Sequence, residues 1–261
     1  MAKITLDIKK SIENNAAVYF EKAKKSKRKL EGAKKAFKKT QDKLNLLNGK
    51  KKKIILKENI AEKSVRKKEW YEKFRWFFSS EGFLCIGGRD ATTNDIIIKK
   101  HADKEDIVFH TDMAGSPFFV IKANNKKIGP KTMEEAAQAT ASYSRAWRLG
   151  LSSLDVFYVK PEQLTKEANS GEYLGKGAFM VKGKTNYLHP ILEVAIGIKD
   201  SIITGGPVNA IKINSDKPLV LKQGKEKTSE IAKKIKKSIG GSIDDITLFI
   251  PAGGSRIQKI K

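Results

Sequence analysis

Side chains that could bind a phosphate or a carboxylate gather in a short stretch that begins with two glycines. Gly87-Gly88-Arg89-Asp90 is followed by Asn94, and the glycine pair allows a tight turn that would present these polar groups. A guanidinium such as that of Arg89 can grip a phosphate or a carboxylate through two hydrogen bonds. The stretch is neither a Walker motif nor a G-x-G-x-x-G loop, so it does not predict a nucleotide loop. Two interpretations remain: Arg89 binds an anion, or it pairs with Asp90 and locks the loop.

A histidine and an aspartate two residues apart form the next possible chemical site. If His110 and Asp112 lie on one strand, both point to the same face, where they could support acid–base chemistry or bind a metal. No nucleophile or third ligand has a matching spacing, and the single cysteine, Cys85, lies in an apolar run. We therefore predict no catalytic residue, no metal and no cofactor. A structural hydrogen bond is the favoured role of the pair, and RNA contact is the alternative.

Basic side chains recur beside aromatic residues and glycines in the rest of the chain. Lys182 and Lys184 would share a strand face on a hairpin within 170–188, a pattern typical of a surface that binds an RNA backbone. A solubilising edge strand is the alternative interpretation of this segment. Further on, Gly253-Gly254 could expose backbone amides to an anion. The residues predicted to contact RNA are Arg89, Asp90, Asn94, His110, Asp112, Lys122, Arg145, Arg148, Lys176, Lys182, Lys184, Tyr187 and Arg256.

The net charge of +24 is distributed unevenly along the 261 residues. Residues 1–70 hold 23 Lys and Arg against 8 Asp and Glu, whereas 71–261 hold 30 against 21. Such an asymmetry predicts a polyanionic partner contacted chiefly through its phosphates. The alternative is a lysine-rich surface of the thermophile type, which would also be rich in glutamate. The first segment has too little acid for that alternative.

The first segment has the pattern of a coiled-coil arm. From Ser11 to Leu47 apolar and small residues repeat with 4-3 spacing, which predicts a long helix with a weak seam. Asn48-Gly49 predicts its end, and a second helix over roughly 50–69 would complete an antiparallel hairpin. The two helices differ in length, so we expect an upstream helix to be missing from this chain. The residues of this arm predicted to contact the polyanionic partner are Lys24, Lys25, Lys27, Arg28, Lys34, Lys35, Lys38 and Lys39.

The remaining residues, 71–261, predict a folded α+β domain with a mainly antiparallel sheet and packed helices. Trp70, Tyr71, Phe74 and Trp76–Phe78 form an aromatic cluster, interpreted as core that also seats the arm. Helices are expected over 132–150, with a capping box at its start, and over 228–239. Ile96–Lys100 fits a strand or a helix, and Asn94-Asp95 before it favours the helix. Strands are expected at 83–86, 108–110, 118–121, 156–159, 178–182, 192–198, 210–213, 219–221 and 246–250.

Several of these segments resemble the NFACT family of ribosome quality-control factors, in its archaeal and eukaryotic, RqcH- and NEMF-like branch. The G-R-D-A-T-T-N-D stretch is similar to the G-R-[DN]-x-x-x-N-[DE] signature of the NFACT-R RNA-binding domain. D-M-A-G-S-P at 112–117 and G-E-Y-L-G-K-G-A-F at 171–179 also resemble the family's wording, as does the loop at 251–259. The resemblance covers nearly the whole chain and implies a middle coiled coil, residues 1–70, followed by an NFACT-R domain, residues 71–261.

By this resemblance the parent protein would bind obstructed large ribosomal subunits and support template-free tailing of stalled nascent chains. The expected partners are ribosomal RNA of the large subunit, peptidyl- or aminoacyl-tRNA, and a chain carrying the absent N-terminal domain, NFACT-N. No apolar run is long enough to span a membrane and no signal core is apparent, so a cytoplasmic location is expected. One alternative is a general nucleic-acid-binding module without a tailing role. Bacterial relatives are also named fibronectin-binding adhesins, but the lysine excess argues against a surface role.

Overall fold

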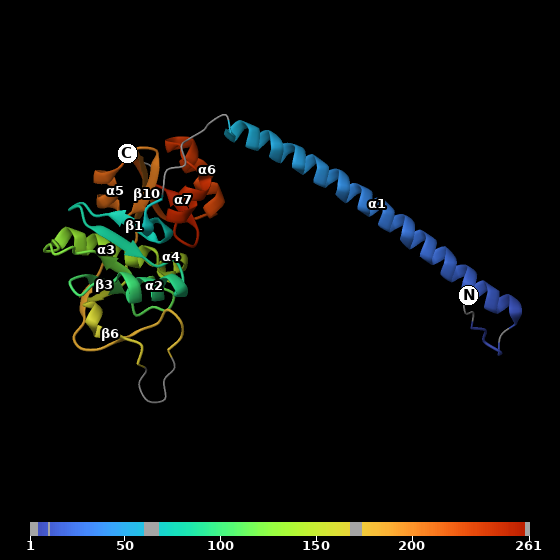
Figure 1. Ribbon diagram of the computed structural model, residues 1–261, viewed down its shortest axis with the longest axis horizontal. Helices are drawn as coiled ribbons and strands as arrows, with labels where there is room; N and C mark the ends of the chain where they lie inside the picture. Colours follow the sequence, from blue (N-terminus) through green and yellow to red (C-terminus); the bar gives the residue numbers. More distant parts are fainter. Residues whose placement is uncertain (1–4, 10, 60–67, 168–173, 259–261) are drawn as a thin grey trace. The chain divides into compact units, whose positions relative to one another are not determined.

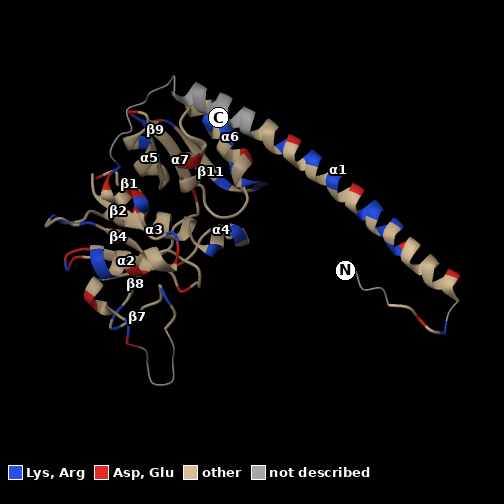
Figure 2. Cartoon of the chain, turned by 45° about the vertical axis from the view of Figure 1, so that its right-hand side comes forward, with Lys and Arg blue, Asp and Glu red and all other residues tan. Residues whose placement is uncertain are grey.

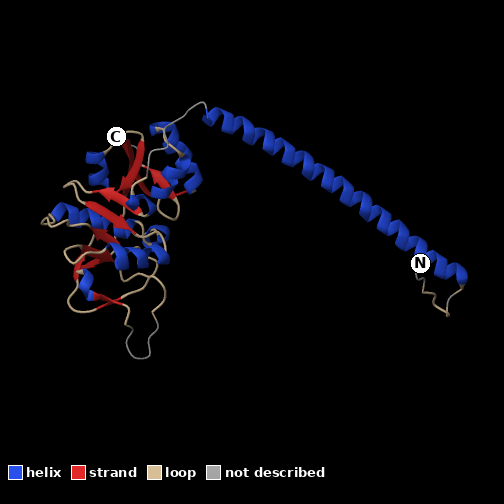
Figure 3. Cartoon of the chain, in the orientation of Figure 1, coloured by secondary structure: helices blue, strands red, loops and turns tan. Residues whose placement is uncertain are grey.

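The computed structural model describes residues 5–9, 11–59, 68–167 and 174–258, with the backbone alone given for 46 and 48–59. The chain divides into two compact units, residues 1–67 and 68–261 (Figure 1). Each unit has its own secondary structure. The first is helical, and the second combines strands and helices (Figure 3). The predicted α+β class is confirmed for the second unit, where every pairing between the described strands is antiparallel.

The first unit is built on a single helix, α1 (Ile12–Asn59), rather than on the predicted hairpin. The predicted turn at Asn48-Gly49 was wrong, because the helix continues through both residues. A glycine inside a helix costs only about 1 kcal/mol relative to alanine, which the propagating turns on either side can offset. The last part of the predicted second helix, 60–67, lies outside the described residues. Residues 5–9 run back beside the start of α1, where Tyr19 donates to the Thr5 carbonyl at 2.7 Å.

The apolar seam of α1 is exposed in this chain. Ile12, Leu30 and Phe37 are 84%, 57% and 71% exposed, and Leu44 and Leu47 are also open to solvent. Lys and Arg recur along the helix between them (Figure 2). The 4-3 pattern therefore describes the face of one helix, and the coiled-coil pairing stays a prediction.

The second unit begins with a six-stranded antiparallel sheet that holds most of the aromatic core. Its order is β1-β2-β4-β3-β5-β8. Phe74, Trp76 and Phe77 are buried, as predicted for the aromatic cluster, whereas Trp70 and Phe78 are about half exposed. The strands are β1 (Arg75–Phe78), β2 (Leu84–Gly87), β3 (Ile107–His110), β4 (Phe119–Ile121), β5 (Val156–Val159) and β8 (Asn186–Leu188).

Three helices accompany this sheet. The predicted helix over 132–150 is instead two helices, because Ser144 adopts an extended backbone and caps the second by accepting from the Ala146 N–H at 3.1 Å. The predicted capping box is absent because the helix starts earlier, at Pro130, and the Thr132 hydroxyl binds Glu81 and Ser79. The elements are α2 (Ala91–His101), α3 (Pro130–Ser142) and α4 (Arg145–Leu149), with short 3-10 turns η1 (Trp70–Lys73) and η2 (Pro161–Gln163).

A second sheet, ordered β10-β9-β11-β12, contacts the first where β1 meets β10. Two strands predicted beside it were wrong: 210–213 and 246–249 are helical, and Ile250 follows the end of the second helix. Short apolar runs fit either structure, and Ser242, which accepts from the Asp244 N–H at 3.2 Å, starts the second of these helices. The elements are β9 (Val194–Lys199), β10 (Ile202–Gly206), β11 (Asp216–Glu226), β12 (Ser255–Ile257), α5 (Val208–Asn214), α6 (Thr228–Ile239) and α7 (Ile243–Phe249), beside a separate ribbon of β6 (Leu164–Thr165) and β7 (Met180–Val181).

Candidate nucleic-acid interface

Three segments that are far apart in the sequence meet around one pocket in the second unit. The pocket has a volume of about 380 Å³ and opens to solvent. We call it the guanidinium pocket, after the arginines that line it. Its lining residues come from 88–91 and Asn94, from the turn at 114–117, and from 176–178, together with Arg75, His110 and Tyr143. Three of the four segments that carried the sequence resemblance contribute to this lining, so the fold joins them in a single site, and the fourth, the loop at 251–259, lies outside it.

The Arg89 side chain connects the pocket to the chain before β1 by hydrogen bonds to backbone carbonyls. Its Nη2 donates to the carbonyls of Phe74 and Glu72 at 2.7 and 3.1 Å, so the guanidinium holds the chain just before β1. Asp90 does not form the ion pair with Arg89 that was considered from the sequence. It is the N-cap of α2 and accepts from the Thr93 N–H at 2.8 Å, and this hydrogen bond lowers the pKa of Asp90. The Nη2 of Arg89 therefore has a structural role, while the side chain also lines the pocket.

Asn94 ties the first segment to the second. Its Oδ1 accepts from the Phe118 N–H at 3.1 Å, and its Nδ2 donates to the Ser116 carbonyl at 3.4 Å. The glycine at position 88 is required here, because a Cβ would lie 1.8 Å from the Asn94 Oδ1. The amide of Asn94 is buried and positions the turn at 114–117, and its contact with RNA stays a prediction.

His110 and Asp112 do not share a strand face, so that prediction was wrong. β3 ends at His110, and Asp112 lies beyond it, exposed to solvent. The imidazole stacks on Phe118 with a centroid separation of 4.0 Å, and its Nε2 is 3.2 Å from the Ser116 carbonyl, which can only accept. Burial lowers the pKa of His110, which keeps the ring neutral at pH 7. The structural hydrogen bond favoured from the sequence is therefore present, but its partner is Ser116.

Arg75 is the lining residue that the sequence analysis missed. Its Nη1 donates to the Leu248 carbonyl at 3.1 Å, and its guanidinium lies 4.5 Å from the centroid of the Tyr143 ring. Burial lowers the pKa of Arg75, and repulsion from Arg89 adds to the effect. Its position inside the aromatic run at 74–78 was the signal that could have identified it, because an arginine among core residues is seldom buried unless its charge is paired.

The third segment brings Lys176 to the rim of the pocket. Lys176 is exposed, and the next residue, Gly177, donates its N–H to the Asp95 carboxylate at 2.9 Å. Asp95 also receives Lys166 at 2.8 Å. Gly177 has a φ of +79°, and a Cβ there would lie 2.6 Å from the Cα of Ala91, so the segment sits directly on the first turn of α2. Residues 170–173 of the predicted hairpin lie outside the described residues.

Lys182 and Lys184 do not share a strand face, because β7 ends at Val181 and both lysines lie in the turn before β8. Lys182 pairs with Glu167 at 2.8 Å, and both groups are exposed. Tyr187 is exposed on β8, which is an edge strand, as the alternative interpretation of this segment expected. These residues form a surface separate from the lining of the guanidinium pocket.

Lys122 is placed in the core and not on the surface. Its ammonium donates to the His101 carbonyl at 2.8 Å, to the Asp103 carboxylate at 2.6 Å and to the buried carboxylate of Asp106. These three acceptors use the three N–H groups of the ammonium. The placement argues against the predicted contact of Lys122 with RNA and gives it a role in stability.

The last predicted arginines are exposed. Arg145 touches the turn at Gly115, a pocket residue, where an added Cβ would be 3.7 Å from its own Cβ. Arg148 lies against the loop at Gly253, and Arg256 is exposed on β12. The Gly254 carbonyl of that loop accepts from the Trp147 indole N–H at 3.1 Å. Arg148 and the 251–256 loop therefore form one basic edge, beside α4.

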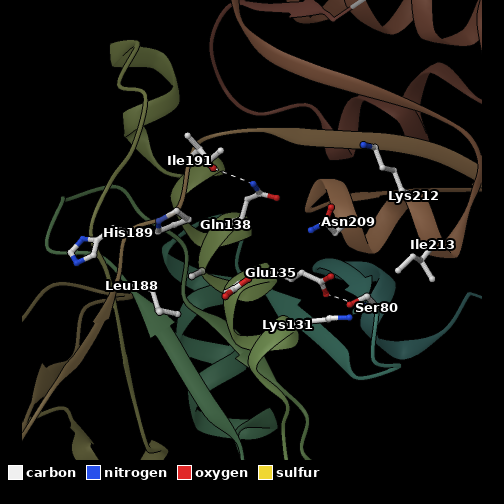
Figure 4. Close-up of a pocket in the computed structure, with 13 residues that line it drawn as sticks. Ser80, Lys131, Glu135, Gln138, Leu188, His189, Ile191, Asn209, Lys212 and Ile213 are labelled. Atoms are coloured by element: carbon white, nitrogen blue, oxygen red, sulfur yellow. Dashed lines mark hydrogen bonds between the residues drawn. The ribbon is translucent and has the colours of Figure 1, made fainter. Parts of the chain in front are cut away.

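A larger cavity, of about 690 Å³, lies between α3, α5 and the segment 188–191, but its charges are balanced (Figure 4). Glu135, only 4% exposed, accepts from the Ser80 N–H at 2.9 Å, and its second carboxylate oxygen has no hydrogen-bond partner. Burial raises the pKa of Glu135. Because Glu134 and Glu135 line this cavity together with Lys131 and Lys212, it is a poor receptor for a polyanion, in contrast to the guanidinium pocket.

The predicted arm residues are all exposed on α1. They are Lys24, Lys25, Lys27, Arg28, Lys34, Lys35, Lys38 and Lys39. Within the part of the chain that the structure describes, no helix is long and apolar enough to cross a membrane. Among those same residues, no group of three or more His, Cys, Asp or Glu side chains has the arrangement of a metal site.

Comparison with known proteins agrees with this geometry. The family described as the NFACT protein RNA binding domain matches residues 73–183, which include all the lining of the guanidinium pocket. The chain carries an NFACT-R domain and belongs to the NFACT family.

The similar proteins include archaeal and eukaryotic relatives. The chain is 43% identical over 206 residues to the archaeal Rqc2 homolog aRqcH of Methanocaldococcus jannaschii, covering 76% of this chain and 31% of that protein. It is 40% identical over 184 residues to the ribosome quality control complex subunit NEMF of Homo sapiens, covering 67% of this chain and 16% of that protein. The Drosophila melanogaster NEMF homolog is 35% identical, with coverages of 75% and 20%. This chain thus spans less than a third of the length of these relatives.

Proposed function

We propose that this chain is the RNA- and ribosome-binding part of a ribosome quality-control factor. In this role it binds the obstructed large ribosomal subunit and tRNA, and it supports template-free C-terminal tailing of stalled nascent chains. The observation that carries the proposal is the convergence of three NFACT-type segments on one cationic pocket. The relatives bear the names of ribosome quality control subunits, which agrees with a ribosomal partner.

The two units divide the work in this proposal. The exposed lysines of α1 contact ribosomal RNA through its phosphates, a type of contact that positions a protein without reading sequence. The guanidinium pocket and the basic edge at Arg148 and Arg256 contact RNA of the subunit or of tRNA. In this proposal the ribosome catalyses peptide-bond formation, and this chain is not an enzyme. A second chain that carries NFACT-N completes the factor, which acts in the cytoplasm.

Co-sedimentation with large subunits, with and without peptidyl-tRNA, tests the proposal across a salt series. Neutralising about six phosphates predicts a log–log salt slope of about −5. Binding that favours subunits with peptidyl-tRNA and weakens in Lys176→Gln, an exposed substitution at the pocket rim, supports the proposal. Equal binding to empty subunits, free tRNA and duplex DNA at matched salt would instead identify a general nucleic-acid-binding module.

A further inference from the structure

We propose that a single phosphate group of the bound RNA enters the guanidinium pocket and lies between Arg75 and Arg89. The inference rests on the proposed RNA-binding function and specifies what this site takes. Its source is either an internal phosphodiester or a terminal phosphate, because both present the same anionic oxygens to a guanidinium.

The first argument is charge. Neither Arg75 nor Arg89 forms an ion pair with any residue that the structure describes, although both side chains are partly buried. Asp90, which lines the pocket, accepts the hydrogen bonds that cap α2; its charge raises the pKa of Arg89, but the two side chains do not form an ion pair. Buried charges are normally paired, because an uncompensated one costs several kcal/mol. An anion from outside the chain would supply the missing partner.

The second argument is hydrogen bonding. The Nε of Arg75 and the Nε of Arg89 are both buried with no acceptor. Arg75 uses one Nη for Leu248, and Arg89 uses one for the carbonyls of Phe74 and Glu72. Each guanidinium thus keeps donors that no described residue satisfies, and a guanidinium matches the oxygens of a phosphate in a fork geometry.

The third argument is the surroundings. Ala91 in the lining belongs to the first turn of α2, an eleven-residue helix whose N-terminal end favours an anion. Lys176 stands at the rim, and the neutral His110, whose Nε2 lies 3.2 Å from the Ser116 carbonyl, adds no charge of its own. The pocket volume of about 380 Å³ exceeds what one phosphate fills, which leaves room for the attached ribose.

NMR of the arginine Nε–Hε groups in the full chain tests the site directly. Inorganic phosphate, and then single-stranded oligouridine with a 5′-phosphate or a 5′-hydroxyl, are titrated against the labelled protein. Arg75→Lys and Arg89→Lys assign the two signals, and thermal melting shows that each variant is folded. We expect both signals to shift saturably with inorganic phosphate and with RNA, and inorganic phosphate should shift them more than it shifts those of Arg148 and Arg256. Lack of any shift at Arg75 and Arg89 with phosphate and with RNA would overturn the inference.

RNA affinity supplies the second readout and separates the two sources. Arg75→Lys keeps the positive charge but removes the paired N–H donors of the guanidinium. We expect it to weaken oligouridine binding about tenfold or more. Lys176→Gln, which leaves the buried arginines intact, should weaken it several-fold, and the exposed α6 substitution Lys237→Gln should change it less than twofold. A marked preference for the 5′-phosphate identifies a terminal group, and equal affinities identify a phosphodiester.

The outcomes distinguish this inference from the proposed function. If the chain binds RNA and subunits normally while Arg75→Lys binds as the unmodified chain does, the phosphate site is wrong and the proposed function stands. If inorganic phosphate shifts both arginine signals but no RNA or subunit is bound, the phosphate site stands and the proposed function fails.

Discussion

The backbone N–H of Gly177 donates a 2.9 Å hydrogen bond to the carboxylate of Asp95, although the two residues are 82 positions apart. Partial burial raises the pKa of Asp95, but hydrogen bonds from Lys166, Lys99 and Gly177 outweigh it, so the pKa lies below its ordinary value. The carboxylate therefore stays ionised and holds the third segment of the guanidinium pocket on the first turn of α2. This junction gives the pocket its rim.

Gly177→Ala should break that junction. Its φ of +79° strains any other residue, and the new Cβ would lie 2.6 Å from the Cα of Ala91. We expect the free energy of unfolding to fall by about 1–3 kcal/mol and RNA affinity to drop with it. Urea denaturation and oligouridine binding measure both effects. Gly175→Ala is the matched control, because nothing lies within 4 Å of its Cβ, and equal behaviour of the two variants would refute the role of this junction.

Lys122→Met should destabilise the second unit by about 3–5 kcal/mol, because it leaves the buried carboxylate of Asp106 without its cation. Thermal and denaturant unfolding measure the loss, and adding Asp106→Asn should recover part of it. Lys126→Met, an exposed change four residues on, is the control. A Lys122→Met protein of full stability but weakened RNA binding would restore the role predicted from the sequence.

Glu135→Gln should stabilise the protein at neutral pH but not in acid. Burial raises the folded-state pKa of Glu135, so the unfolded chain loses its proton first as the pH rises. The native protein therefore loses stability as the pH rises above about 4.3 and through the higher folded-state pKa. The variant has no carboxylate to ionise. Unfolding curves at pH 4 and pH 7.5 check the prediction, which fails if the difference between the two proteins is the same at both.

Neutralising the arm should change the salt dependence of RNA binding. The fourfold variant Lys24→Gln, Lys27→Gln, Lys34→Gln and Lys38→Gln removes exposed charges from α1. If all four contact phosphates of double-helical RNA, the log–log salt slope should become shallower by about 3–4. Anisotropy or sedimentation across a salt series measures it. The matched control neutralises Lys126, Lys127, Lys199 and Lys237 of the second unit, and an equal change there would mean that the arm contributes only net charge.

The local sequence pattern was enough to predict the elements whose conformation depends on residues near each other in the chain. The i, i+4, i+8 spacing of Ile231, Ile235 and Ile239 predicted α6, because residues at this spacing lie on one face of a helix and can be buried together. The G-G-R-D turn and its Asn94 were also recognisable, because glycine and amide chemistry is local. The short apolar runs at 210–213 and 246–250 were not, since they fit a strand or a helix equally well until neighbours cover them.

The amino-acid sequence by itself determined the α+β class, the basic helical arm and the three segments of the NFACT type. Only the tertiary structure decided that these segments share one pocket, that Lys122 is buried in an ion pair, and that Arg75 joins Arg89. The physical reason is that burial and pairing depend on residues distant in the chain: Arg75 meets Leu248, and Lys122 meets Asp106, only after the sheets have formed.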